Sequence, residues 1–315
     1  MMRKVVVFFA IFCLGTDVLI SQTEPTVTQY MLNNSAFNPA AAGEGEMIQL
    51  SGLHRISWIG TPNAGQTSVF QVNAPFKMMG TQHAAGIKIK DDRAGQFFYR
   101  GVWLQYAYKK PLSNGATLSI GIDLGFLNAG FHGDSIVMPT TGTYHNKEGD
   151  TFLQMGSAAG TVFDGGAGIF YDANSFYAGI SYVNATNPTV VWSSNNSYKM
   201  LGTAYVTGGY KYRFANPQLV LTPSVLVMTN FTVAQVDLSA VLNYNNRIRG
   251  GLSYRWGNAL GIVLGCTVLD GLSLGYAYDV PFSPINTWGS HEMSVKYEFA
   301  IGGKTRAKHK SIRIL

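Results

Sequence analysis

Residues 117–131, TLSIGIDLGFLNAGF, alternate apolar and polar side chains with a period of two. The apolar members occupy every second position: Leu118, Ile120, Ile122, Leu124 and Phe126. In a β-strand, successive side chains point to opposite faces, so this stretch predicts a strand with one apolar and one polar face. A length of about ten residues also suits a tilted strand that crosses a bilayer. The fold class therefore depends on the solvent that the apolar face meets.

The same alternation recurs along the rest of the chain. The further segments are 48–58, 70–74, 85–90, 96–110, 165–171, 175–183, 200–214, 219–229, 232–243, 247–256, 259–266, 272–279 and 291–299. Together they predict about fourteen strands, an even number, as bacterial transmembrane barrels have. Only 13% of the residues are charged, which is about half the usual share. We therefore expect an all-β fold, a transmembrane up-and-down antiparallel β-barrel, rather than a soluble sandwich.

The predicted connections support this interpretation because long and short ones alternate along the chain. The long ones, all odd-numbered, are 59–66, 132–163, 184–198 and 280–290. The even-numbered ones are mostly short, namely 172–174, 215–218, 244–246 and 267–271, with 75–82 the longest. Bacterial barrels have short periplasmic turns and long extracellular loops. The alternation thus places the protein in the outer membrane with both termini in the periplasm.

The first residues have the features of an export signal. Arg3 and Lys4 precede an apolar run over residues 5–14, too short to span a bilayer as a helix. We predict a signal peptide over residues 1–21, a pre-barrel segment over 22–44, the barrel over 45–299 and a basic periplasmic tail over 300–315. The mature chain keeps one cysteine, Cys266, so it can form no internal disulfide.

Two segments outside the strands are candidates for binding. Residues 22–44 lack alternation but contain apolar side chains, so they can fold into the lumen as a plug or bind a periplasmic partner, and we favour the lumen. The candidate partner-binding residues in this segment are Tyr30, Asn38 and Pro39. Those in the tail are Lys304, Arg306, Lys308, Lys310 and Arg313. The tail could contact an acidic partner or a lipid surface, or simply be disordered, and nucleic acid is not expected in the periplasm.

No catalytic, metal or cofactor motif is present. The chain lacks GxSxG, HExxH, CxxC and a phosphate-binding loop. His291 and Glu292 are neighbours in a strand and point to opposite faces, so we interpret them as a strand-end polar pair. Asp91, Asp92 and Arg93 are interpreted as a solvated hairpin tip.

An enzyme remains a weaker hypothesis, and it rests on the longest loop. Residues that could form a hydrolytic set there are His132, Asp134, Ser135, His145 and Asp150. We expect no enzyme activity, and no catalytic, metal-binding or cofactor-binding residues.

Several segments, in this order, resemble the PorP/SprF family of type IX secretion outer-membrane proteins. The first is QYMLNNSAFNPAAAG (29–43), followed by Arg55 and Trp58 in an Arg-x-x-Trp strand. The others are FDGGAGIFYDANSFYAGISYVN (163–184), RGGLSYRWGNALGIVLG (249–265), LSLGYAYD (272–279) and SHEMSVKYEF (290–299). The likeness covers nearly all of the mature chain, although many members end at an aromatic residue on the last strand and this chain continues past Phe299.

The resemblance implies a FadL-like barrel of fourteen strands that serves protein secretion, and gliding in motile relatives. It implies contact with outer-membrane lipid and with periplasmic components, namely a peptidoglycan-binding lipoprotein, a lipoprotein-containing ring and possibly secreted cargo. We therefore expect a non-enzymatic barrel that docks machinery or cargo. The alternative is a FadL-like or porin-like transporter of small solutes, and the state of the lumen distinguishes the two.

Overall fold

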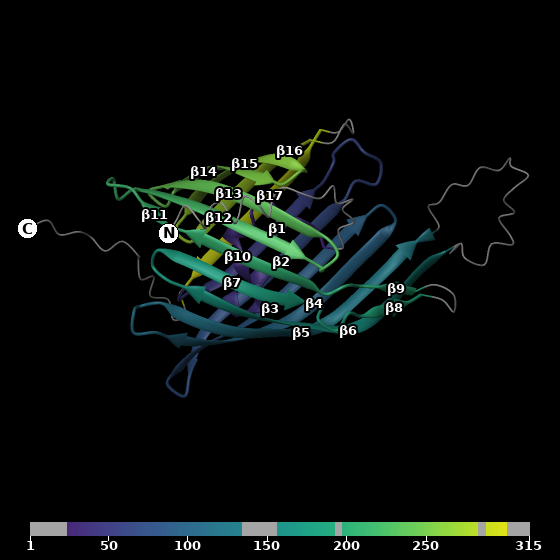
Figure 1. The fold of residues 1–315 in the computed structure, drawn as a ribbon, viewed down its shortest axis with the longest axis horizontal. Coiled ribbons are helices and arrows are strands. Elements are labelled where there is room, and N and C mark those ends of the chain that lie inside the picture. The colour runs from purple at the N-terminus through teal and green to yellow at the C-terminus, as the bar shows by residue number, and fades with distance from the viewer. Residues whose placement is uncertain (1–23, 134–155, 193–196, 283–287, 301–315) are drawn as a thin grey trace, which may run out of the picture.

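A computed structural model describes residues 24–133, 156–192, 197–282 and 288–300 of the protein as a closed antiparallel β-barrel (Figure 1). It has fourteen wall strands. Their bounds are β1 Ile48–Ile56, β2 Gln66–Met78, β3 Thr81–Ala94, β4 Phe97–Pro111, β5 Thr117–His132, β6 Ser157–Asp172, β7 Phe176–Val183, β10 Thr203–Tyr210, β11 Tyr212–Arg213, β12 Leu219–Thr229, β13 Ala234–Tyr244, β14 Ile248–Arg255, β15 Ala259–Leu269, β16 Leu272–Pro281 and β17 Ser290–Phe299. β10 and β11 both pair with β12 and form one wall strand. The predicted fold class is confirmed.

The first and last strands close the barrel. β1 pairs with β17 in a register that sets Ile48 opposite Phe299 and Ile56 opposite His291. Each wall strand pairs antiparallel with its neighbours, and a separate two-stranded hairpin of β8 (Thr189–Val191) and β9 (Ser197–Lys199) lies in the connection from β7 to β10. Among the described residues, no helix is long and apolar enough to cross a membrane.

The two faces of β5 are those that the alternation predicts. Ile120, Leu124 and Phe126 point outward and are 50–63% exposed, as expected for side chains that meet lipid. Asp123 points into the lumen and is 1% exposed. Because the side chains of a strand alternate, neighbouring strands continue the apolar outer band.

Several predicted connections are partly strand in the structure, and β6 begins at Ser157, inside the predicted loop 132–163. Residues 75–82 hold only a two-residue turn, in which Met79 and Gly80 adopt the positive φ values that a tight hairpin needs. Asp91, Asp92 and Arg93 lie inside β3 rather than in a hairpin tip. At Asp91 and Arg93 the outward positions of β3 become polar, so the alternation ends before the strand does.

The long connections share one end of the barrel with three short turns, and the other end has short turns only. The long ones are 57–65, 133–156, 184–202 and 282–289, parts of which lie outside the described residues. The short turns beside them are 95–96, 230–233 and 256–258, and those at the opposite end are 79–80, 112–116, 173–175, 214–218, 245–247 and 270–271. We call these the long-connection end and the short-turn end.

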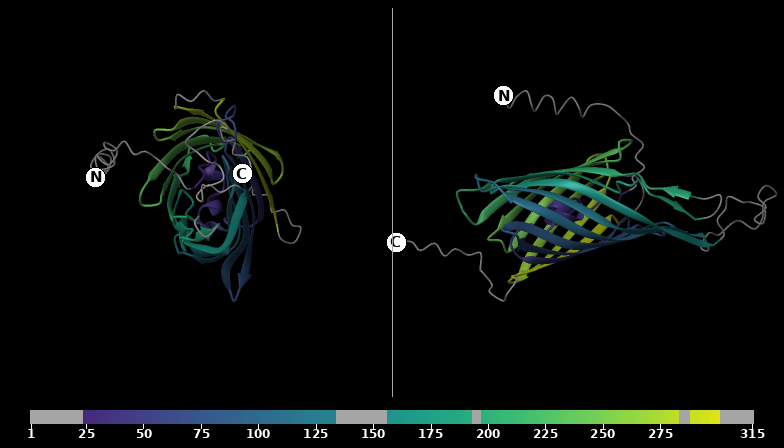
Figure 2. Two further views of the ribbon diagram at one scale, coloured as in Figure 1. Left: turned by 90° about the vertical axis from the view of Figure 1, so that its right-hand side faces the viewer. Right: turned by 90° about the horizontal axis from the view of Figure 1, so that it is seen from below.

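Residues 24–44, called the plug segment, run inside the barrel (Figure 2, left). The segment contains three short 3-10 helices, η1 (Tyr30–Leu32), η2 (Asn34–Ala36) and η3 (Pro39–Ala41). Glu24 bonds Asn184 just beyond β7, which places it toward the long-connection end. The chain then descends through the lumen and enters β1 at the short-turn end. Residues 1–23 and 301–315, which include the predicted signal peptide and nearly all of the predicted tail, lie outside the described residues.

Candidate functional site

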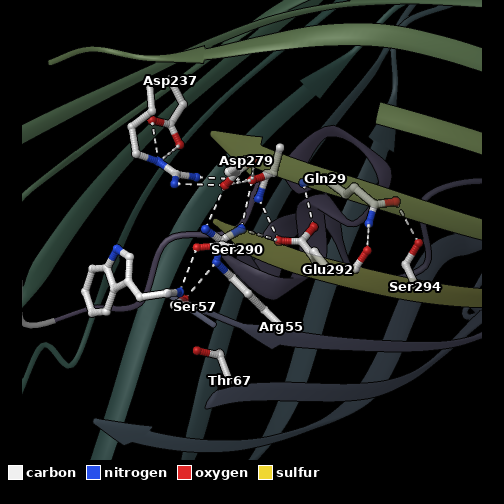
Figure 3. A network of polar contacts seen from close by, with 12 residues as sticks. Gln29, Arg55, Ser57, Thr67, Asp237, Asp279, Ser290, Glu292 and Ser294 are labelled. Atoms are coloured by element: carbon white, nitrogen blue, oxygen red, sulfur yellow. Dashed lines mark hydrogen bonds and ion pairs between the residues drawn. The ribbon is translucent and has the colours of Figure 1, made fainter. Parts of the chain in front are cut away.

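The plug segment is held to the last wall strand by one carboxylate. Glu292 of β17 accepts the backbone N–H of Thr28 at Oε2 and that of Gln29 at Oε1, both at 2.8 Å (Figure 3). The Gln29 side chain donates to the Glu292 carbonyl at 3.4 Å and accepts from Ser294 Oγ at 2.8 Å. Glu292 is fully buried. Hydrogen bonds to a charged group in such a place are worth about 1.5–3 kcal/mol each.

Buried charges from four other strands surround this carboxylate. Arg55 Nη2 lies 2.7 Å from Asp279 Oδ2, and Arg55 Nη1 lies 3.3 Å from Glu292 Oε2. Arg255 bridges Asp237 Oδ1 at 3.3 Å and Asp279 Oδ2 at 3.2 Å. We call these five residues the latch (Figure 3).

The latch contains one more carboxylate than guanidinium groups. A buried charge without a partner costs several kcal/mol. The two backbone N–H groups from the plug segment supply the missing compensation at Glu292. Thr28 also donates its hydroxyl to Asp279, at 2.7 Å from Oδ2. The barrel wall and the plug segment are therefore electrostatically complementary.

Tyr30 anchors the next turn of the plug segment. Its hydroxyl lies 3.1 Å from Ser239 Oγ and 3.3 Å from Ser224 Oγ, and it donates to the Asp237 carbonyl at 3.3 Å. Burial raises the pKa of the Tyr30 hydroxyl above 10, although the serine hydrogen bonds lower it. The ring packs in an apolar cluster with Val27. Tyr30 is therefore neutral and fixed on both its apolar and polar sides.

Glycines in the wall make room for η3. A Cβ on Gly121 would collide with the backbone of Ala40, and one on Gly168 would collide with the Asn38 amide oxygen. Asn38 Oδ1 accepts from the Ala40 N–H at 3.0 Å, which caps η3. Its Nδ2 donates to the carbonyls of Ile169 at 2.9 Å and Ile180 at 3.3 Å. One side chain thus caps the helix and bonds it to two wall strands.

The plug segment ends against β3 and β4. Lys109 donates its Nζ to the Gly43 carbonyl. Ala42, Ala84 and Ala107 pack together without any exposed surface. Gly43 has a φ of +62° and its Cβ position meets Ala84, so a larger residue would be strained there.

The structure places the predicted binding residues of the pre-barrel segment inside the barrel. Tyr30, Asn38 and Pro39 are buried against the wall, so a partner could reach them only if the plug segment moved. The predicted tail residues lie outside the described residues: Lys304, Arg306, Lys308, Lys310 and Arg313.

Sequence reasoning missed the role of Glu292. The prediction that it and His291 face opposite ways agrees with the structure, since His291 bonds the Tyr276 hydroxyl at 2.6 Å, away from the latch. Glu292 is nevertheless the main anchor of the plug segment. The alternation of β17 places Glu292 on the lumen side, which indicates a buried carboxylate in need of partners. Those partners, Thr28 and Gln29, are more than 260 residues away in sequence, so the pattern of one strand could not identify them.

The residues considered for catalysis form no complete set in the described chain. His132 Nδ1 lies 3.1 Å from Ser157 Oγ in an exposed position. Asp134, Ser135, His145 and Asp150 lie outside the described residues. Within those residues, no three or more His, Cys, Asp or Glu side chains are placed to hold a metal ion.

The comparisons with known proteins identify the type of barrel. Residues 19–297 match the family described as type IX secretion system membrane protein PorP/SprF. No curated protein matches the sequence significantly.

Solved structures with a similar shape include several barrels at low identity. The toluene transporter TodX of P. putida is 9% identical over 85% of this chain and 94% of its own, with a TM-score of 0.47. The toluene transporter TbuX of Ralstonia pickettii is 14% identical over 87% and 94%, with a TM-score of 0.46. The CymD monoaromatic hydrocarbon channel is 11% identical over 87% and 94%, with a TM-score of 0.48.

Proposed function

The chain belongs to the PorP/SprF family of type IX secretion system membrane proteins, and from this premise we propose that it is a closed docking barrel. In this proposal the barrel carries no substrate through its lumen and catalyses no reaction. It provides a rigid outer-membrane site on which periplasmic secretion components, or cargo, are held.

The observation that carries the proposal is the latched plug segment. It contacts the wall from Glu24 to Gly43 and is fixed by one ion pair, by hydrogen bonds to its backbone and by a glycine-lined seat. Free diffusion through the lumen would require the loss of several of these interactions together. A fixed plug suits a docking component better than a pore.

The short-turn end is the proposed docking face, and it faces the periplasm in the orientation expected for bacterial barrels. Four of its turns have an exposed basic residue in or just before them: Lys77, Lys110, Arg213 and Arg247. The five basic residues of the tail follow β17, whose last residue, Phe299, lies at this same end. We call Lys77, Lys110, Arg213 and Arg247 the basic rim. Such a face favours an acidic partner surface.

The components implied by the family are candidates for this face. They are a peptidoglycan-binding lipoprotein, a lipoprotein-containing ring and the secreted cargo. Co-purification from membranes in mild detergent tests the proposal, with full-length protein compared with a truncation after Phe299. Partners captured by the full chain and depleted by the truncation would support docking through the tail. An unchanged partner set would remove the tail from the proposal, and the absence of any secretion component would overturn docking.

A FadL-like or porin-like transporter of small solutes is the second candidate, and a cavity in the lumen beside the plug segment favours it. Planar bilayers separate the two functions. The docking proposal expects no channel steps from the intact protein and clear steps after deletion of residues 24–42. Steps of the same size from both proteins would favour transport.

A further inference from the structure

A cavity lies between the plug segment and the wall, on the long-connection side of η2. The space between its lining atoms, counted together with open solvent at its mouth, is about 690 Å³. Its walls are mainly apolar: Val27, Tyr30, Phe37, Leu53, Val69 and Tyr205. A concave apolar site with a few convergent polar groups is the usual form of a small-molecule site.

The polar groups at one side of the cavity already bind a carboxylate. The Glu24 side chain pairs with Lys90 Nζ through Oε2 and accepts from Asn184 Nδ2 at 2.6 Å through Oε1. Lys90 also lies 4.8 Å from the centre of the Tyr99 ring. All four residues line the cavity. Glu24 therefore occupies the place that a ligand's carboxylate would take.

The two cavity lysines differ in how their charges are compensated. Lys88 pairs at 2.8 Å with Asp123, which belongs to the wall. Lys90 pairs with Glu24, which belongs to the plug segment, and no other carboxylate of the described chain lies within ion-pair distance of its Nζ. Loss of the Glu24 contact would thus leave a partly buried cation, 13% exposed, and an amide donor facing a mainly apolar cavity. Burial of an unpaired charge is costly, so a second carboxylate would be bound in its place.

We propose that this cavity binds a small organic monocarboxylate, with its carboxylate on Lys90 and Asn184 and its apolar part against Phe37, Val69 and Tyr205. Glu24 is then an internal competitor. A bound ligand displaces it and loosens the first turn of the plug segment, and by linkage a detached Glu24 raises ligand affinity by the same factor. This site is independent of docking at the short-turn end.

Equilibrium dialysis of the purified full chain in detergent micelles tests the proposal, with labelled phenylacetate as the probe. 2-Phenylethanol is the uncharged control ligand, and empty micelles give the partition blank. We expect saturable binding of phenylacetate and at least about tenfold weaker binding of the alcohol, because only the acid can pair with Lys90. Equal binding of the two ligands, or no binding of the acid, would overturn the proposal.

Variants of Glu24 and Lys90 test whether Glu24 competes with the ligand carboxylate. Glu24→Ala is expected to tighten phenylacetate binding by about tenfold, a typical coupling factor. Lys90→Gln is expected to weaken it by at least as much, while Lys199→Gln, which removes an exposed lysine of β9, leaves it unchanged. If Lys90→Gln does not fold, as judged by the loss of heat-modifiable migration in gels, Asn184→Ala replaces it as the variant that should weaken phenylacetate binding. Unchanged affinity in Glu24→Ala would show that Glu24 does not compete and would refute the site as described.

Discussion

Gln29 and Glu292 form two hydrogen bonds with each other, although 263 positions separate them in sequence. The Gln29 backbone N–H bonds the Glu292 carboxylate at 2.8 Å, and the Gln29 side chain bonds the Glu292 carbonyl at 3.4 Å. A residue before the first strand is thus fixed to the strand that closes the barrel. In the proposed function, the closed state of the lumen depends on this contact and on the charges around it.

Glu292→Gln is expected to loosen the plug segment without changing the wall. The amide keeps the shape of the side chain but loses the charge that two backbone N–H groups bind, a loss of about 1.5–3 kcal/mol per bond at most. Planar bilayers should show intermittent channel steps for this variant and none for the parent protein. Glu298→Gln, on the same strand and the same face near the short-turn end, is the control and should stay silent. The absence of channel steps in both variants would mean that the latch does not hold the plug segment.

Arg55→Met should destabilise the barrel by about 3–5 kcal/mol, because it leaves the carboxylates of Asp279 and Glu292 buried with too little positive charge. Addition of Asp279→Asn should recover part of this loss, since one of the two carboxylates that lose Arg55 is then neutral. Urea unfolding in lipid vesicles, followed by tryptophan fluorescence, measures both effects. Additive losses in the double variant would contradict a coupled network.

Gly121→Val tests the seat of η3. The new side chain would occupy the space of the Ala40 backbone, so the plug segment should leave its seat while the barrel still forms. Limited proteolysis should then cut the chain between residues 30 and 45, where the parent protein is protected. Gly250→Val is the matched control, because nothing lies within 4 Å of its Cβ position. Equal protection of both variants would contradict the close fit.

Ile122→Arg should block insertion, because its side chain points to lipid at mid-strand, where an arginine costs about 2–4 kcal/mol. The alternation alone predicts that Ser119→Arg is tolerated. In the structure Ser119 is 3% exposed and lies opposite Lys109, which binds the end of the plug segment. We therefore expect Ser119→Arg to insert but to displace that end. Heat-modifiable migration in gels reports insertion, and proteolysis reports the plug segment.

The basic rim can be tested by charge reversal. Lys77→Glu combined with Lys110→Glu should reduce co-purification of periplasmic partners several-fold, and the remaining binding should weaken further as salt increases. Arg93→Glu with Arg100→Glu, at the long-connection end, is the control for net charge and should have no effect. A similar loss in both pairs would point to a general charge effect rather than to a docking face.

The sequence predicted the wall of the barrel far better than its contents. Strand number and the faces of β5 follow from a period of two, which is a local property that the side chains of one segment reveal. The partners of Glu292 could not be found in this way, because they depend on where the plug segment lies in the closed barrel. The role of the glycines that contact η3 could not be predicted either. In the sequence, Gly121 and Gly168 are ordinary small residues of the polar face, and only the position of η3 shows why no larger side chain fits there.

The position of the plug segment also constrains the order in which the parts of the barrel fold. Its residues precede the first wall strand in the sequence, yet they bond Glu292, which belongs to the last wall strand. Contacts across such a separation form late in folding, after the cost of closing the chain has been met. The hydrogen bonds of Thr28 and Gln29 to Glu292 can therefore form only when β17 is in place beside β1. Docking of the plug segment would then mark the moment at which a barrel is complete, and an unfinished barrel would be recognisable by a free N-terminal arm.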